Sequence, residues 1–116
     1  MATRIELVLD CADGERLAAF WAEALGYRRY GSAGTYIALV PIEGDTPKLI
    51  LQQVPEPKAG KNRMHLDVLA PDIEAEASRL EVLGAQRTRV EPVVEHGTQW
   101  IVMADPEGNE FCVCQA

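Results

Sequence analysis

Two polar side chains occupy matching places in two stretches where apolar and polar residues alternate. Glu6 lies in RIELVLD, and His65 lies in RMHLDVL. A carboxylate and an imidazole can serve as general acid and base, or can bind zinc, nickel, manganese or iron. Other interpretations stay open: a structural ion pair, a histidine that lines a binding cleft, or a histidine that Glu6 or Asp67 satisfies through hydrogen bonds.

Further donor groups lie near the C-terminus. Glu110, Cys112 and Cys114 alternate in NEFCVC, which places all three on one face of a predicted strand. Neighbours on one face are poorly placed to bridge each other, so we expect the three cysteines of the chain, Cys11 included, to be reduced. Thiols can act as soft metal ligands or nucleophiles. Because no basic group nearby in sequence would lower their pKa, we interpret these cysteines as small buried hydrophobic residues.

Other side chains are candidates for contact with a ligand. Arg63 shares the strand face of His65 by the period of two, so it is placed either to meet an anionic substrate or to lie in a solvated loop. Trp100 lines either a cleft or the helix layer, whereas Trp21 falls in a helical apolar stripe and is predicted to be core. His96, beside Gly97, lies in a loop or at the start of a strand.

The first half of the chain predicts the elements that position Glu6. Residues 4–10 predict a strand, and ADGERLAAFWAEALGY predicts an amphipathic helix that Asp13 caps and Gly26 ends. Three strand-like stretches follow, YRRYGS, TYIALVP and PKLILQQV. Two prolines and a glycine in PEPKAGK then indicate a connector.

The second half repeats this order. RMHLDVL predicts a strand, APDIEAEASRLEVLGA a helix capped by Asp72, and QRTRVEPVV, TQWIVMAD and NEFCVC three further strands, with DPEGN as a turn between the last two. Asp72 follows Asp13 by 59 residues, the offset that also separates His65 from Glu6. We therefore predict a single domain with module one at 1–54, a connector at 55–61 and module two at 62–116.

An internal repeat of this kind indicates half-domains that pair, with equivalent residues near a pseudo-twofold axis. The apolar residues of each half face its helix, so Glu6 and His65 are predicted on the opposite, concave face. On the last strand Phe111 and Val113 would face the helices, which leaves Cys112 on the concave side.

The chain resembles the vicinal oxygen chelate superfamily, which includes glyoxalase I, extradiol dioxygenases and bleomycin-resistance proteins. It is most similar to the small glyoxalase-like domain subgroup. The segments that carry the resemblance span nearly the whole chain and are DGERLAAFWAEALGY, VPEPKAGKNRMHLDV, MHLDVLAPDIEAEASRLEVLGA and MADPEGNEFCV. The resemblance implies an α+β fold in which two βαβββ modules form a curled mixed sheet with helices on the convex face.

The resemblance also implies a divalent metal in the hollow, with one ligand from each of four strands. By position the candidates are Glu6, Gln52 or its neighbour, His65 and a residue of NEFCV. Metal-binding members place a glutamate seven residues after the aspartate of the DP-G turn, where this chain has Cys112. Glu110 lies two residues earlier, a shift of about 6–7 Å along a strand.

We therefore predict two sets of site residues. The metal ligands are Glu6, His65 and Glu110, of which Glu6 and His65 would also be catalytic. The residues predicted to contact a ligand are Gln52, Arg63, Asp67, Trp100 and Cys112.

Composition excludes several classes of function. The 116 residues carry 11 basic and 18 acidic side chains, for a formal charge of -7, and such a field repels a nucleic-acid backbone. No apolar run approaches the roughly 18 residues of a spanning helix, and the N-terminal residues lack the pattern of a signal peptide. We expect a cytoplasmic protein that does not contact membranes.

Three functions fit these observations. The first is a metal-dependent lyase, isomerase or dioxygenase. The second is a bleomycin-resistance-type protein that sequesters a small molecule without chemistry, and the negative charge would favour a cationic ligand. The third is a domain with a vestigial hollow that serves association. The resemblance implies a homodimer in all three cases.

Overall fold

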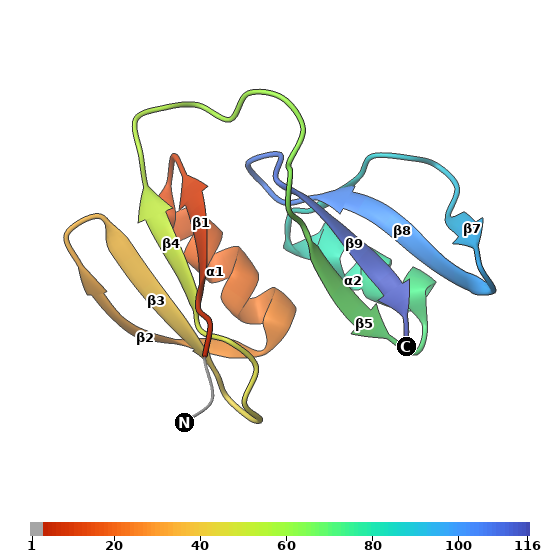
Figure 1. Cartoon of the computed structure of the whole chain (residues 1–116), viewed down its shortest axis with the longest axis horizontal. Coiled ribbons are helices and arrows are strands. Elements are labelled where there is room, and N and C mark those ends of the chain that lie inside the picture. The colour runs from red at the N-terminus through yellow and green to blue at the C-terminus, as the bar shows by residue number, and fades with distance from the viewer. Residues whose placement is uncertain (1–3) are drawn as a thin grey trace. The chain divides into compact units, whose positions relative to one another are not determined.

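The computed structural model describes residues 4–116 as an α+β fold with two helices and nine strands (Figure 1). The chain divides into two compact units. The first extends to Pro57, and the second spans Lys58–Ala116. The elements in chain order are β1 Leu7–Cys11, α1 Gly14–Leu25, β2 Tyr27–Ala33, β3 Tyr36–Pro41, β4 Leu49–Gln53, β5 Leu66–Ala70, α2 Ile73–Leu83, β6 Gln86–Arg87, β7 Val93–Glu95, β8 Thr98–Ala104 and β9 Glu110–Gln115.

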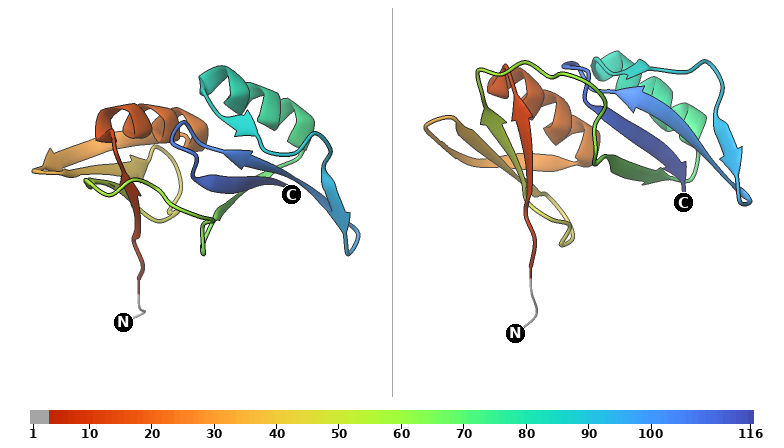
Figure 2. Two further views of the ribbon diagram at one scale, coloured as in Figure 1. Left: turned by 90° about the horizontal axis from the view of Figure 1, so that it is seen from above. Right: turned by 45° about the horizontal axis from the view of Figure 1, so that its top comes forward.

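The first unit is a mixed four-stranded sheet covered on one face by α1 (Figure 2). The strand order is β1-β4-β3-β2, in which β1 and β4 are parallel and the other pairs are antiparallel. The helix packs its buried Leu17 and Trp21 toward Leu49 and Leu51, which alternate along β4 and are also buried. Within residues 4–57, α1 is the one helix, so the opposite face of this sheet carries none from its own unit.

The second unit repeats this arrangement with α2. Its strand order is β5-β9-β8-β6, with β7 also paired to β8, and β5 runs parallel to β9 as β1 does to β4. Phe111 and Val113 of β9 are buried on the helix side together with Leu80 of α2, as predicted from alternation. The repeat read from the sequence is therefore a repeat of structure.

Both helix starts are capped as predicted. The side chain of Asp13 accepts a hydrogen bond from the backbone N–H of Arg16 at 3.2 Å, and that of Asp72 accepts one from Ala75 at 3.1 Å. Each cap satisfies one backbone donor that the first helical turn leaves without a partner, a contribution of about 1 kcal/mol. Gly26 ends α1 at a φ of 69°, a left-handed conformation that glycine adopts without a steric penalty.

Two predicted strands begin later than their alternation indicated. Strand β1 begins at Leu7 rather than Arg4, and Ile5, predicted to face the helix, is 65% exposed. Strand β5 begins at Leu66 rather than Arg63. The side-chain amide of Asn62 donates to the backbone carbonyl of Glu110 at the start of β9, which is one physical reason why strand pairing does not continue there.

The stretch QRTRVEPVV is not one strand, as predicted, but two short strands, β6 and β7, separated by residues 88–92. The backbone N–H of Thr88 still donates to the carbonyl of Val102, but Pro92 lacks an N–H and cannot join a sheet ladder. The second module therefore contains one strand more than predicted. Within residues 4–116, neither helix is long and apolar enough to span a membrane.

Candidate functional site on the second sheet

The face of the second sheet opposite α2 carries most of the predicted site residues. In the pairing of β5 with β9, Asp67 lies directly opposite Cys112, and in the pairing of β8 with β9, Cys112 lies opposite Val102. Residues opposite one another in a sheet share a face. Because Phe111 and Val113 are buried on the helix side, Asp67, Cys112 and Val102 lie on the other side, which we call the open face.

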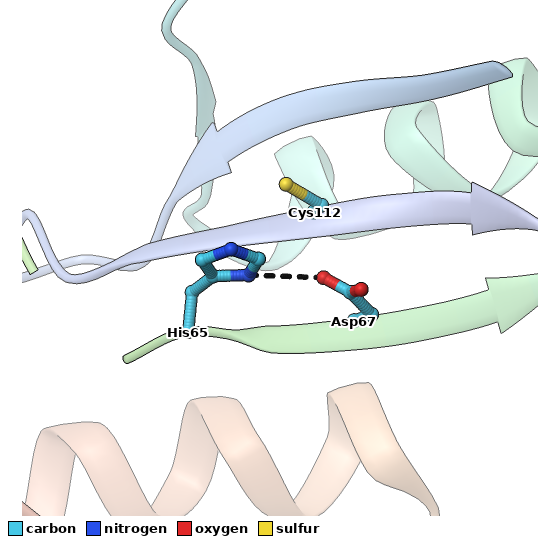
Figure 3. A group of neighbouring side chains, drawn as sticks. All are labelled: His65, Asp67 and Cys112. Carbon is cyan, nitrogen blue, oxygen red and sulfur yellow. Dashed lines mark ion pairs between the residues drawn. The ribbon is translucent and has the colours of Figure 1, made fainter. Parts of the chain in front are cut away.

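Three donor residues meet on the open face. His65 comes directly before β5, Asp67 comes from β5 and Cys112 from β9. Nδ1 of His65 lies 3.0 Å from Oδ1 of Asp67, and one ligand atom from each of the three side chains lies within 4.8 Å of the others (Figure 3). We call His65, Asp67 and Cys112 the donor cluster. Its histidine and aspartate are about half exposed, whereas Cys112 is only 8% exposed.

The thiols on the open face are protonated at neutral pH in the absence of a metal. Burial raises the pKa of Cys112, and the negative charge of Asp67 raises it further. Burial, again with Asp67, raises the pKa of Cys114 to about 11. All three cysteines of the chain are free, with Cys11 and Cys112 buried. Burial agrees with the interpretation of Cys112 as a small buried hydrophobic residue, whereas Cys114 is only partly buried.

Glu110, a predicted metal ligand, forms ion pairs with two lysines. Its carboxylate lies 2.9 Å from Nζ of Lys61 and 3.6 Å from Nζ of Lys58, both in the segment between β4 and β5. The hydrogen bond from Lys61 lowers the pKa of Glu110. This carboxylate is therefore ionised at neutral pH, is a weak proton acceptor and already has two cationic partners.

An apolar row lies beside the donor cluster on the open face. Leu69 of β5 lies opposite Cys114 of β9, Cys114 opposite Trp100 of β8, and Trp100 opposite Val93 of β7. Leu69 is 68% exposed, which is unusual for a leucine within a sheet. The register thus decides the question that the sequence left open, because Trp100 lies on the open face and not in the helix layer.

Glu6 and Gln52 belong to the first unit. Glu6 directly precedes β1 and forms an ion pair with Lys48 at 3.3 Å, and Nζ of Lys48 also lies 5.2 Å from the centre of the Tyr30 ring. These side chains and Arg28 line an open hollow in this unit. Gln52 lies opposite Tyr36 in the sheet, on the face away from Leu51.

The side chain of Gln53, the neighbour of Gln52, has a structural role. Oε1 of Gln53 accepts a hydrogen bond from the backbone N–H of Gly14 at 3.1 Å, so this side chain satisfies a donor at the start of α1. It is therefore already engaged on the helix side of the sheet. Of the two glutamines that could serve as a metal ligand, only Gln52 faces away from the helix.

The remaining two candidates lie in connecting segments. Arg63 is exposed in a bend before β5, which agrees with a solvated loop, one of the two positions predicted for it. His96 and Gly97 form the turn between β7 and β8, with φ values of 53° and 74°. Positive φ at both residues is typical of a tight two-residue hairpin turn. The loop position predicted for His96 is confirmed.

Sequence reasoning missed Lys48, Lys58 and Lys61 as partners of the predicted carboxylates. The basic composition of the connector was visible, but alternation along one strand does not say which acidic residue a loop lysine meets. It also did not single out Asp67 and Cys112 as a pair that joins His65. That pairing depends on the register of two strands whose partners are 45 residues apart in the chain.

Comparisons with known proteins agree with this architecture. The family model of the glyoxalase-like domain matches residues 6–114. The fosfomycin resistance protein FosX from Listeria monocytogenes aligns with a TM-score of 0.79 at 12% identity, over 100% of this chain and 94% of that chain. A glyoxalase/bleomycin resistance protein/dioxygenase family enzyme from Burkholderia phytofirmans aligns with a TM-score of 0.78 at 13% identity, over 95% of each chain.

A third structure, FosX from Mesorhizobium loti, has a TM-score of 0.75 at 17% identity and covers 100% of this chain and 93% of its own. No sequence among curated proteins matches the chain. Identities this low establish the fold alone, whereas the family model covers nearly every residue and confirms the resemblance read from the sequence. The chain belongs to the glyoxalase-like domain family.

Proposed function

We propose that the chain is a metal-dependent enzyme of the lyase, isomerase or dioxygenase type that acts on a small organic molecule at the open face of the second sheet. The observation that carries this proposal is the donor cluster, in which an imidazole nitrogen, a carboxylate oxygen and a thiol sulfur lie within 4.8 Å of one another. Because three protein donors gather among residues 4–116, a coordination position would stay open for a substrate, as in catalytic metal sites.

The donor cluster fits a small divalent ion. Bond lengths of about 2.0–2.3 Å at tetrahedral angles place neighbouring ligand atoms about 3.3–3.8 Å apart. Nδ1 of His65 lies 3.0 Å from Oδ1 of Asp67, and the three donor atoms all lie within 4.8 Å of one another, which is close to this spacing. A bound divalent ion would supply Lewis acidity toward a carbonyl or toward vicinal oxygens of the substrate.

The side chains around the donor cluster have separate tasks in this proposal. The apolar row with Trp100 and Leu69 holds the carbon body of the substrate against the sheet. Glu110 is kept ionised by Lys61, so it accepts hydrogen bonds and does not take up a proton at neutral pH. His65 is the proposed metal ligand, and the catalytic role of Glu6, which belongs to the first unit, stays a prediction.

Removal of His65 tests the proposal. Protein purified without chelator is expected to contain about one equivalent of a divalent metal per chain, and His65→Ala is expected to lose it. His96→Ala is the matched control, because His96 lies in a hairpin turn and outside the donor cluster. Elemental analysis gives the metal content. A wild-type chain that stays metal-free after dialysis against zinc, manganese and iron salts contradicts the proposal.

A second function is favoured by one observation. Glu6 is paired with Lys48, and Glu110 with Lys58 and Lys61, so two of the three ligands that the resemblance implied are already engaged by ammonium groups. The set Glu6, His65 and Glu110 does not fit a metal as well as the donor cluster does. A chain without bound metal would instead sequester a small molecule on the open face of the second sheet.

Thermal denaturation separates the two functions. If the chain sequesters a cationic aromatic molecule, the metal-free protein gains about 2.7 kcal/mol of stability when the ligand is present at 100 times its dissociation constant, with a matching rise in Tm. An unchanged Tm across a panel of such compounds contradicts sequestration.

We also propose that two copies of the chain associate in the cytoplasm. Light scattering tests that association against the 12.7 kDa mass of one chain.

A further inference from the structure

We propose that the donor cluster is a thiolate site, selective for zinc or another thiophilic divalent ion over magnesium and manganese, with Cys112 as the residue that determines the choice. This inference rests on the proposed function in one respect, because both require His65, Asp67 and Cys112 to bind the ion. It adds the chemical class of the metal and assigns a ligand role to a cysteine.

The inference depends on the position of Cys112 and not on the presence of thiols in general. Cys112 lies on β9, between β5 and β8, so strands on both sides hold its backbone in place. Its direct partner on β5 is Asp67, the residue that contacts His65. A thiol fixed beside an aspartate and a histidine is placed as a ligand before any ion arrives.

Cys114 provides an internal comparison. It lies on the same strand and the same face, two residues further along, but its partners across the sheet are Leu69 and Trp100. Neither partner offers a metal ligand, and Cys114 is not a member of the donor cluster. Both thiols therefore lie near Asp67, with which Cys114 forms a side-chain hydrogen bond, but only Cys112 lies in a group that also includes the His65 imidazole.

The donor set selects among metals. Magnesium and manganese favour oxygen ligands, and magnesium requires six in nearly ideal octahedral geometry. The donor cluster offers one carboxylate, one imidazole and one thiol, which suits a tetrahedral ion of intermediate softness. On binding, Cys112 gives its thiol proton to solvent, and the sulfur lone pair forms the bond to the metal.

Cobalt(II) is the probe for the thiolate, because a cobalt–thiolate bond gives an intense near-ultraviolet charge-transfer band. The full chain titrated with cobalt(II) is expected to show this band, and Cys114→Ser is expected to keep it. Cys112→Ser is expected to lose it. Zinc should abolish the band by competition at equimolar concentration, whereas magnesium in large excess should leave it unchanged.

Zinc affinity gives a second measure. Substitution of a residue that only supports a ligand typically weakens metal binding 10- to 100-fold, so loss of the ligand itself in Cys112→Ser should cost at least about 100-fold. Cys112→Asp should lose the cobalt band and bind manganese more tightly than the wild-type chain does. Circular dichroism of the metal-free variants confirms that they are folded.

X-ray absorption of the zinc-loaded wild-type chain keeps the inference testable if a Cys112 variant does not fold. One sulfur at about 2.3 Å from zinc is expected. Zinc bound by nitrogen and oxygen alone, or a cobalt band that survives in Cys112→Ser, would overturn the thiolate assignment. Loss of metal in His65→Ala would then still support the proposed function, whereas a wild-type chain that binds no metal at all overturns both.

Discussion

Asp105→Ala is expected to lower the free energy of unfolding by about 3 kcal/mol. Asp105 is 3% exposed, and its Oδ1 accepts hydrogen bonds from the backbone N–H groups of Glu107 and Asn109, each at 2.9 Å. The side-chain amide of Asn109 also lies within 3.1 Å of both carboxylate oxygens. Removing the carboxylate takes this acceptor away from the buried backbone N–H and side-chain amide of Asn109 and from the partly buried N–H of Glu107.

The substitution should also weaken the donor cluster. Asp105 organises the turn that leads into β9, and Cys112 lies seven residues further on that strand. If the turn opens, the register that places Cys112 opposite Asp67 loses its anchor at one end. Metal affinity should therefore fall together with stability, although Asp105 is not a proposed ligand.

Urea denaturation followed by circular dichroism measures this effect. Asp105→Asn is the matched variant, because it keeps the size of the side chain and one acceptor oxygen, and its loss should be smaller. An Asp105→Ala chain within about 0.5 kcal/mol of wild type, the usual range for surface substitutions, would show that the turn does not depend on the carboxylate.

Trp21→Ala is expected to destabilise the chain more than Asp105→Ala does, by about 4 kcal/mol. Trp21 is 1% exposed in the core of the first unit, and its ring meets that of Phe20 edge to face with centres 5.0 Å apart. Truncation to alanine removes the buried ring and leaves a cavity that the surrounding β-sheet can fill only in part. Chemical denaturation monitored by circular dichroism gives the loss.

Trp100→Ala is the matched control for Trp21→Ala, since Trp100 lies on the open face of the second sheet. Its removal should change stability by less than about 1 kcal/mol, because a partly exposed side chain gains less from burial. The same variant should weaken binding of an apolar or aromatic ligand. Equal destabilisation by the two substitutions would show that Trp100 belongs to a core and not to an open binding surface.

Much of the fold could be predicted from local patterns. Asp13 and Asp72 mark the helix starts because the cap depends only on residues within one turn. Phe111 and Cys112 point to opposite faces because side chains alternate along any strand. The strand ends were less predictable, because Asn62 and Pro92 stop pairing through contacts or missing donors that alternation does not reveal.

The candidate site, like the fold, could be predicted from the sequence only in part. The sequence by itself determined that Asp67 and Cys112 lie on the faces of their strands away from the helices, and it singled out His65, which comes directly before β5. Only the tertiary structure decided that Asp67 and Cys112 lie opposite each other, and that lysines engage Glu6 and Glu110. The physical reason is range: capping and alternation act within a few residues, whereas register and ion pairing join segments tens of residues apart, which no local pattern encodes.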